Sequence, residues 1–461
     1  MKIIISGGWG YGNLGDDAIL DATIHQLQAQ FPGCQCVVLT YDLVDSAIHA
    51  TEGVKLQIGA HGLTDGGGCE LFRPSMVQDY SLPRKVWVKT KFALTETATW
   101  FNYVSNSQTL QELRALLATA DLFVMSGGGY FNEKWMNKTR AQLLELRMAE
   151  QAGVPTLILG PTIGRFEGVI RQEIESCFRQ ALLVTVRDEF SFAEATQWSE
   201  HVSVVPDIAL SNWLSTPVAA SGLGIVFTSS HAEFSERVAQ SVKSFVERCG
   251  EDWSVKLFVT RRWKYDLRAA ITLQEQLQSL GVACDLVMPS NFRNLEMGLA
   301  ACRIVISENL HGLILAARNL VPVVAVNDYP VGSPNYKKFI AFLAQSNSQD
   351  LFFNAKSNVE NIASTLLALA RGYETKKNEL RTLREQVAEQ YGQALSGLDL
   401  PRLKKERAVD APRSNLHSVS ATIIGVDGDS MIEDREVRTA HQEAISGFDL
   451  QSNGHLEKQR P

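Results

Sequence analysis

Short apolar runs rich in β-branched residues alternate with longer segments of helical periodicity along most of this chain. Before residue 212 the expected strands are Ile3–Ser6, Cys36–Thr40, Leu122–Ser126, Thr156–Leu159 and Leu183–Val186. Helical patterns lie between several of them, as at Thr139–Gln151 and Gly168–Gln180. Strands separated by helices pair in parallel and need helices on both faces. The pattern therefore predicts an α/β fold built on a parallel sheet.

The same alternation restarts after a small, polar, proline-containing segment at 213–222, which has the composition of a linker. The expected elements are strands Leu223–Thr228, Val255–Thr260, Ala283–Val287, Arg303–Ser307 and Val321–Val326, and helices Glu233–Cys249 and Asp266–Leu280. With 461 residues, 45% of them hydrophobic, the chain is long enough for two cores. We therefore predict two Rossmann-like domains, 1–212 and 222–395, that face each other across a cleft.

Two stretches depart from this pattern, and a helical segment lies between them in the sequence. Residues 43–109 are broken by glycines and prolines and have poor periodicity, so we expect an irregular insertion or a lid over the cleft. Residues 359–393 indicate one or two helices. From about residue 400 the chain is polar and charged with few aromatic residues, so 400–461 is expected to be a disordered tail without a role in chemistry.

The turn from Ser307 to Gly312 joins an expected strand to the apolar helical segment Leu313–Ala317. Such a turn lies at the carboxyl edge of a parallel sheet, where open α/β sheets bind ligands. His311 within it titrates near neutral pH, so it could move a proton or bind an anion. The alternative is that His311 caps the helix or satisfies a buried backbone group.

The chain opens with a strand, a glycine-rich loop and the start of a helix. Glycine permits positive φ and close approach of a ligand, and free amides at a helix start attract anions. Asp16 and Asp17 add negative charge and are typical N-cap residues. Gly10, Gly12 and Gly15 have G-x-G-x-x-G spacing, which is common in strand–helix turns. Since no P-loop lysine follows, we expect no Walker-type nucleotide site.

Composition favours a cytosolic protein. A net charge of −7 argues against a nucleic-acid partner. The seven scattered cysteines are typical of reduced thiols, and Cys34-Gln35-Cys36 lacks a second ligand pair, so we expect no metal site. We find no signal peptide and no apolar run long enough to span a membrane. A basic and aromatic stretch at 85–101 leaves peripheral contact with a membrane open, against the alternative of a partly buried helix with a solvated basic edge.

Six motifs occur in a fixed order: Gly12–Ile19, Leu122–Phe131, Gly160–Gly164, Val186–Ser191, Pro206–Asp207, and Leu310–Gly312 followed by Val321–Val324. In this order they make the chain resemble the polysaccharide pyruvyl transferases. The resemblance implies a GT-B-like arrangement, with ligands between the two carboxyl edges. It implies transfer of a pyruvyl group from phosphoenolpyruvate to a saccharide or lipid-linked saccharide of a cell-surface or exopolysaccharide precursor, as a ketal, with no cofactor.

This reaction needs an acid, a base and several anion donors. On the resemblance, His311, Asp16 and Asp207 are the expected catalytic residues, and Arg187 is expected to bind an anion through two N–H groups. Further substrate-binding residues are expected at Gly12, Asn13, Gly127, Gly128, Gly129, Glu308, Asn309, Lys337 and Lys338. The alternatives are capping or turn formation for the aspartates, and a surface salt bridge with Asp188 or Glu189 for Arg187.

The chain departs from the family pattern at position 309. The family turn usually reads Arg-Leu-His-Gly, and here the first residue is Asn309, which can hydrogen-bond an anion but cannot neutralise it. Either another cation compensates, or the donor differs. The available cations are Arg165, Arg171, Arg187, Arg318, Lys337 and Lys338. The departure keeps two alternatives open: a GT-B-type glycosyltransferase that uses a nucleotide sugar, and a non-catalytic glycan-binding relative.

Overall fold

The computed structural model describes residues 1–10, 12–40, 54–58, 107–132, 135–216, 218–250, 253–261 and 264–398. Every described residue belongs to one compact unit, which lies within Met1–Arg413. The predicted tail, the basic stretch at 85–101 and most of the predicted insertion at 43–109 lie outside the described residues.

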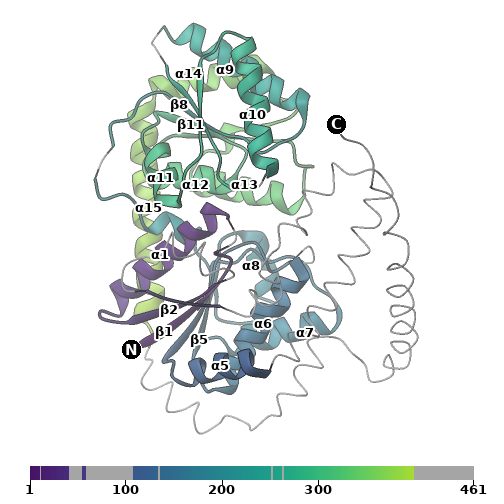
Figure 1. Cartoon of the computed structure of the whole chain (residues 1–461), viewed down its shortest axis with the longest axis vertical. Helices are drawn as coiled ribbons and strands as arrows, with labels where there is room; N and C mark the ends of the chain where they lie inside the picture. The colour runs from purple at the N-terminus through teal and green to yellow at the C-terminus, as the bar shows by residue number, and fades with distance from the viewer. Residues whose placement is uncertain are drawn as a thin grey trace, which may run out of the picture. The chain divides into compact units, whose positions relative to one another are not determined.

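The first sheet of the described chain has seven parallel strands in the order β3-β2-β1-β4-β5-β6-β7 (Figure 1). They are β1 Lys2–Ser6, β2 Gln35–Thr40, β3 Lys55–Ile58, β4 Leu122–Ser126, β5 Thr156–Leu159, β6 Leu183–Val186 and β7 Val202–Val204. The helices are α1 Leu14–Gln30, α5 Ser107–Ala118, α6 Met136–Gln151, α7 Gly168–Gln180, α8 Glu189–Ala195 and the 3-10 helix η4 Ile208–Ser211. The strand order reverses between β1 and β4, the place where such sheets open a ligand crevice.

The second sheet has six parallel strands within the described ranges, in the order β10-β9-β8-β11-β12-β13. They are β8 Leu223–Val226, β9 Val255–Phe258, β10 Cys284–Val287, β11 Ile304–Ser307, β12 Val323–Asn327 and β13 Phe352–Asn354. The helices are α9 Ala232–Cys249, α10 Lys264–Ser279, α11 Phe292–Ala300, α12 Leu310–Arg318, α13 Pro334–Gln345, η5 Gln349–Leu351, α14 Val359–Arg371 and α15 Tyr373–Ser396. The predicted α/β class with two parallel sheets is confirmed.

Of the four edge strands in the described sheets, the sequence predicted β10, as Ala283–Val287, and missed β3, β7 and β13. β3 falls inside the stretch predicted to be an irregular insertion, and β7 and β13 are three residues each. β7 is only partly buried, so it lacks the apolar run that marked the central strands. The helical stretch at 359–393 is two helices, separated at Gly372. The proposed split into domains 1–212 and 222–395 stays a prediction.

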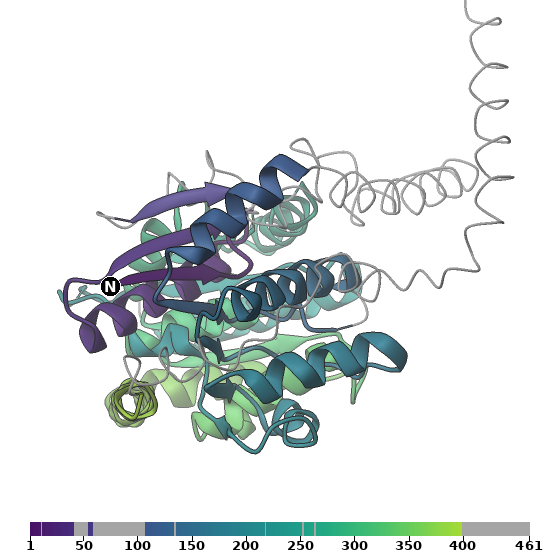
Figure 2. The same ribbon diagram turned by 90° about the horizontal axis from the view of Figure 1, so that it is seen from below.

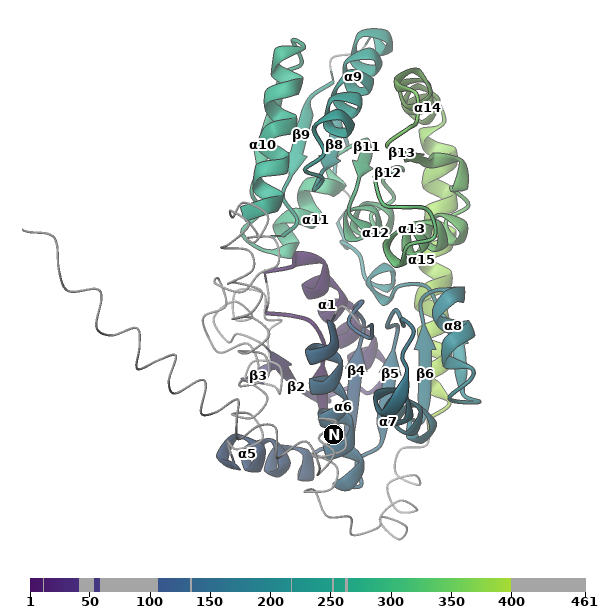
Figure 3. The same ribbon diagram turned by 90° about the vertical axis from the view of Figure 1, so that its right-hand side faces the viewer.

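Helix α15 follows the second sheet in sequence but also packs on the first half of the chain (Figure 3). Leu380, Val387 and Tyr391 are buried in the core cluster that also contains Ile3 of β1. The Tyr391 hydroxyl donates to the carbonyl of Pro206 at 3.2 Å. Figure 2 shows this helix nearly end-on. Burial of this apolar stripe ties the end of the described chain to its beginning.

Candidate active site

The carboxyl ends of strands from both sheets converge on a small cleft. From the first sheet come Arg187 and Asp207, which follow β6 and β7. From the second half come Leu310 at the start of α12 and Lys338 on α13. The complete lining is Arg187, Asp188, Asp207, Leu310, Ile314, Lys338, Ala341, Phe342 and Gln345. Residues predicted from separate motifs therefore meet at one place.

Asn309, and not His311, caps helix α12. The Asn309 side-chain oxygen accepts hydrogen bonds from the backbone N–H groups of His311 at 2.9 Å and Gly312 at 3.3 Å. Ser307 braces the turn, because its Oγ accepts from the Asn309 N–H at 3.0 Å. The capping alternative for His311 is therefore wrong, and its imidazole is available for other contacts.

The His311 imidazole lies directly against the backbone of Gly15 in α1. A Cβ atom added at Gly15 would lie 2.2 Å from Cγ and Nδ1 of the ring, so a larger residue would displace it. His311 Nε2 is buried and has no hydrogen-bond partner within the described part of the chain. Buried polar atoms without a partner are rare in folded proteins, and this marks His311 as a candidate functional residue.

Burial lowers the pKa of His311 below its ordinary value of 6.5. The carboxylates of Asp16 and Asp207 oppose this shift, and the cations Arg187 and Lys338 reinforce it. The imidazole is therefore neutral at pH 7 while the cleft holds no anion.

Asp16 lies buried in the first turn of α1, with two donors on one of its oxygens. The Asn13 side-chain amide donates to Asp16 Oδ2 at 2.7 Å, and the Tyr130 hydroxyl donates to the same oxygen. Asn13 also caps the helix, since its Oδ1 accepts from the Gly15 N–H at 3.3 Å. The carboxylate of Asp16 is thus fixed in place without serving as the cap.

Arg187 is buried and pairs with Asp207. Its Nη1 lies 2.5 Å from Asp207 Oδ2, and its Nε donates to Thr162 Oγ1 at 2.7 Å. The salt-bridge alternative named the wrong partners, because Asp188 caps α8 through the Ser191 N–H and Glu189 is exposed. Asp207 Oδ1 accepts from the Ala209 N–H at 3.0 Å, so Asp207 both caps η4 and holds the guanidinium.

Two cations from opposite halves converge on the glycine triplet after β4. Gly127 and Gly128 have φ of +61° and +85°, a region that favours glycine. A Cβ added at Gly129 would lie 2.6 Å from Lys338 Nζ and 3.7 Å from Arg187 Nη2. Both positively charged groups therefore lie close to the backbone of Gly129.

Most of the other predicted residues and candidate cations do not line the cleft. Gly12 has φ of +70°, and its neighbour Asn13 bridges to Arg261 of the second half. Lys337 points its Nζ at the ring of Phe190, 4.7 Å from the centroid. Of the six cations considered as substitutes for the family arginine, only Arg187 and Lys338 line the cleft. Arg318 is fully buried at the far end of α12, while Arg165 and Arg171 pair with Glu194 and Glu175.

Glu308 connects two strands of the second sheet. Its Oε2 accepts from Thr228 N at 2.8 Å and from Thr228 Oγ1 at 3.2 Å. Burial raises the pKa of Glu308 to about 8; the Thr228 hydrogen bonds oppose this shift, and Asp328 adds to it. Glu308 does not line the small cleft.

Sequence reasoning missed Tyr130 and Thr162 as site residues. Both stand in the recognised motifs, directly after the glycine triplet and within Gly160–Gly164, but their partners Asp16 and Arg187 are distant in sequence. Across the described ranges, no group of three or more His, Cys, Asp or Glu residues is arranged to hold a metal ion. In the same part of the chain, no helix has the length and apolar character needed to cross a membrane.

Solved structures with the same architecture identify the class of fold. UDP-GlcNAc 2-epimerase from Neisseria meningitidis bound to UDP-GlcNAc is 12% identical, with a TM-score of 0.51, covering 89% of this chain and 100% of that one. A putative UDP-N-acetylglucosamine 2-epimerase from Listeria monocytogenes is 11% identical, with a TM-score of 0.50, covering 89% and 98%. These likenesses place the two parallel sheets in the GT-B class of folds.

The family follows from the sequence itself. The family described as polysaccharide pyruvyl transferase matches residues 13–328, which is more than half of the chain. This protein belongs to the polysaccharide pyruvyl transferase family. No curated protein sequence matches it significantly.

The contact between Gly15 and His311 predicts a specific effect of one methyl group. Gly15→Ala should displace the imidazole and lower the free energy of unfolding by about 1–3 kcal/mol, because the added Cβ overlaps the ring. Gly392→Ala is the control, since Gly392 is also helical and a Cβ there meets no atom within 4 Å. Denaturant unfolding measures both. Equal stability of the two variants would contradict the close contact.

The raised pKa of Glu308 predicts a pH dependence of stability. The folded protein binds this proton more tightly than the unfolded chain, so the stabilisation is complete below pH 4.5 and is lost as pH rises through about 8. Between these pH values, titration of Glu308 lowers the free energy of unfolding by at most roughly 1.4 kcal/mol per pH unit. Glu308→Gln mimics the protonated form and should remove this decline. Unfolding curves at pH 5 to 8 test this, and parallel trends in both proteins would show that Glu308 does not titrate there.

Proposed function

We propose that this protein transfers a pyruvyl group from phosphoenolpyruvate to a saccharide or lipid-linked saccharide of a cell-surface or exopolysaccharide precursor and closes a cyclic ketal. Membership of the family supports the reaction class. The observation that carries the proposal is the convergence of Arg187 and Lys338 on the backbone of Gly129, near His311. Phosphoenolpyruvate carries a phosphate and a carboxylate, and two cations at a glycine suit such a donor.

This arrangement also supports an answer to the missing arginine at position 309. Asn309 uses its side-chain oxygen to cap α12, so it contributes to the shape of the turn and no charge. Lys338 supplies a positive charge from α13 instead, and Arg187 supplies a second one from the first half. On this proposal, Lys338 and Arg187 supply the positive charge that the family pattern places at position 309.

Binding of the donor prepares His311 for proton transfer. The imidazole is neutral in the empty cleft, and a bound anion beside it would raise its pKa. The resulting imidazolium gives its proton to the methylene carbon of phosphoenolpyruvate, which becomes a methyl group and leaves C2 electrophilic. The first acceptor hydroxyl adds to C2 and loses its proton to Asp16.

The ring then closes on the same carbon. The bond from C2 to the phosphate oxygen breaks, the second acceptor hydroxyl adds, and its proton leaves with the phosphate. The proton held by Asp16 returns to His311 and restores the imidazolium of the donor complex. When the phosphate leaves, the imidazolium releases this proton to solvent and becomes neutral again. Asp207 has a different role, since both of its oxygens are engaged, and it holds Arg187 toward the donor.

The direct test incubates the full chain with phosphoenolpyruvate and a panel of glycans and measures release of inorganic phosphate. Glycan-dependent phosphate release is expected, and His311→Ala should lower it by about 100-fold without unfolding the protein. His25→Ala is the control, because His25 is exposed on α1. Nucleotide release from a nucleotide sugar instead would favour a glycosyltransferase, and glycan binding without either product would favour a non-catalytic relative.

Two adjacent lysines give a matched test of donor binding. Lys338→Met should weaken phosphoenolpyruvate binding by about tenfold, because it removes a charged donor at Gly129. Lys337→Met should leave binding nearly unchanged, because the Lys337 ammonium lies over Phe190. Calorimetric titration measures both. A loss confined to Lys337→Met, or shared equally, would place the donor elsewhere.

A further inference from the structure

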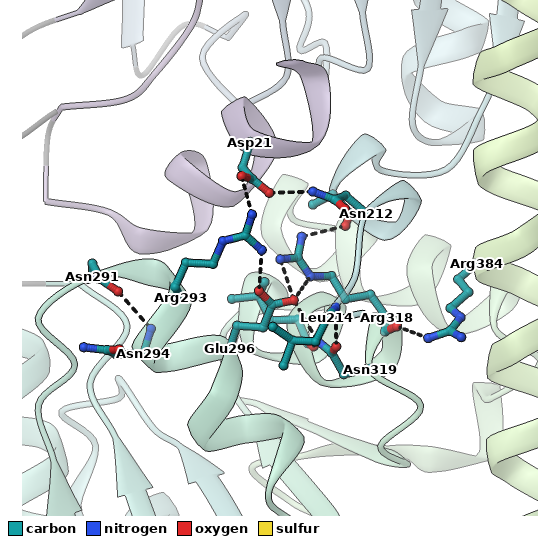
Figure 4. A network of polar contacts seen from close by, with 12 residues as sticks. Asp21, Asn212, Leu214, Asn291, Arg293, Asn294, Glu296, Arg318, Asn319 and Arg384 are labelled. Carbon is teal, nitrogen blue, oxygen red and sulfur yellow. Dashed lines mark hydrogen bonds and ion pairs between the residues drawn. The ribbon is translucent and has the colours of Figure 1, made fainter. Parts of the chain in front are cut away.

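We propose that a polar network at the C-terminal end of α12 positions His311 against the first turn of α1, and that Arg293 is its connecting residue. The network consists of Asp21, Asn212, Arg293, Glu296, Arg318 and Asn319 (Figure 4). Its expected effect on turnover rests on the proposed function, whereas its effect on the His311 imidazole does not.

Arg293 joins the two halves of the chain. Its Nη2 lies 2.6 Å from Asp21 Oδ1 on α1, and its Nη1 lies 3.2 Å from Glu296 Oε2 on its own helix α11. The other oxygen of Glu296 accepts from Arg318 Nε at 2.7 Å, and Arg318 Nη2 lies 2.6 Å away. A continuous chain of charges thus runs from α1 through α11 to the end of α12 (Figure 4).

The segment between the two sheets is held by the same groups. Asn212 donates to Asp21 Oδ2 at 2.7 Å, and Arg318 Nη1 donates to the carbonyl of Ala209 at 3.0 Å. Asn319 donates to Glu296 Oε1 at 2.9 Å and accepts from the Leu214 N–H at 3.1 Å. The network therefore fixes α1, α11, α12 and the connecting segment together.

Most of the charged side chains of this network are buried. The side chains of Glu296 and Arg318 are fully buried and that of Asp21 is 6% exposed, whereas Arg293 is 43% exposed. A buried charge that loses its partner is strongly unfavourable, so sliding one helix past another would carry a high cost. Few relative positions of the helices satisfy all four charges, and this favours a single register between α1 and α12.

The same two helices carry the candidate catalytic groups. His311 and Arg318 are seven residues apart in α12, about two turns, so both lie on one face of that helix. α1 presents Asp16 and Gly15 in its first turn and Asp21 further on. The helix pair is thus held at two points: the imidazole against Gly15 at one end and the network at the other.

The depth at which His311 sits should depend on the network. If the contact between α1 and α12 loosens, water reaches the imidazole and its pKa moves back toward 6.5, since burial is the main cause of the lowering. The charged groups that act on the ring are Asp16, Asp207, Arg187 and Lys338, and the variants below leave all four intact. A purely stabilising network would leave this pKa unchanged.

The test compares two arginines with the same local pattern. Arg293→Met removes both ion pairs and the cation–π contact with Phe292, and it leaves an unbranched apolar side chain at this position. Arg147→Met is the control, because Arg147 also pairs with a glutamate three residues on and with a carboxylate of a neighbouring helix, within the first half alone. Arg293→Lys restores the charge. The measurements are the His311 pKa by NMR, thermal melting, and kcat and KM with phosphoenolpyruvate.

Arg293→Met should raise the His311 pKa and lower kcat by about tenfold with little change in KM, because the donor-binding cations are untouched. Arg293→Lys should recover part of both effects, and Arg147→Met should produce neither. If Arg293→Met does not fold, Asp21→Asn makes the same comparison. An unchanged pKa, or an equal change in Arg147→Met, would overturn the proposal. If the wild type does not turn over phosphoenolpyruvate, the proposed function is wrong. The comparison of His311 pKa values still tests whether the network positions His311.

Discussion

The structure depends on the close approach of α1 and α12, where the imidazole of His311 rests on the backbone of Gly15. Because residue 15 has no side chain, the glycine-rich loop of the first sheet and the polar turn of the second come together at their carboxyl edges. The backbone hydrogen bond from the Leu14 N–H to the Thr260 carbonyl at 3.1 Å supports the same junction. The contact helps to bring residues from both halves together at the edge where open α/β sheets bind ligands.

Charges buried at the junction are matched to one another, and this matching decides which groups remain for a ligand. Arg187 pairs with Asp207 through Nη1, and Arg318 pairs with Glu296, so neither guanidinium is buried alone. Gln345 of α13 donates to the Arg187 carbonyl at 2.9 Å, which holds the helix of Lys338 beside the first half. His311 adds a polar group whose pKa a nearby anion would raise.

Much of the fold was predictable because central strands of parallel sheets are continuous apolar runs. β4, β5 and β6 occur within the predicted bounds, whereas the edge strand β7 has only three, partly exposed residues. The loops at the site were also predictable, since glycines and a polar turn mark them. The contacts between site residues could not be predicted. Tyr130 donates to Asp16, which is 114 residues away in the sequence. Lys338 lines the cleft and the adjacent Lys337 does not, because the two side chains leave helix α13 in different directions.

The central claim is that His311 lies in an anion site shared by both halves of the chain. The most direct measurement is the pKa of His311 by NMR with and without phosphoenolpyruvate, assigned by comparison with His311→Ala. The account predicts a value below 6.5 in the unliganded protein and a clear rise when the donor binds, because its negative charge stabilises the imidazolium. A pKa that stays the same while phosphoenolpyruvate demonstrably binds would contradict the account, because the donor would then lie away from His311.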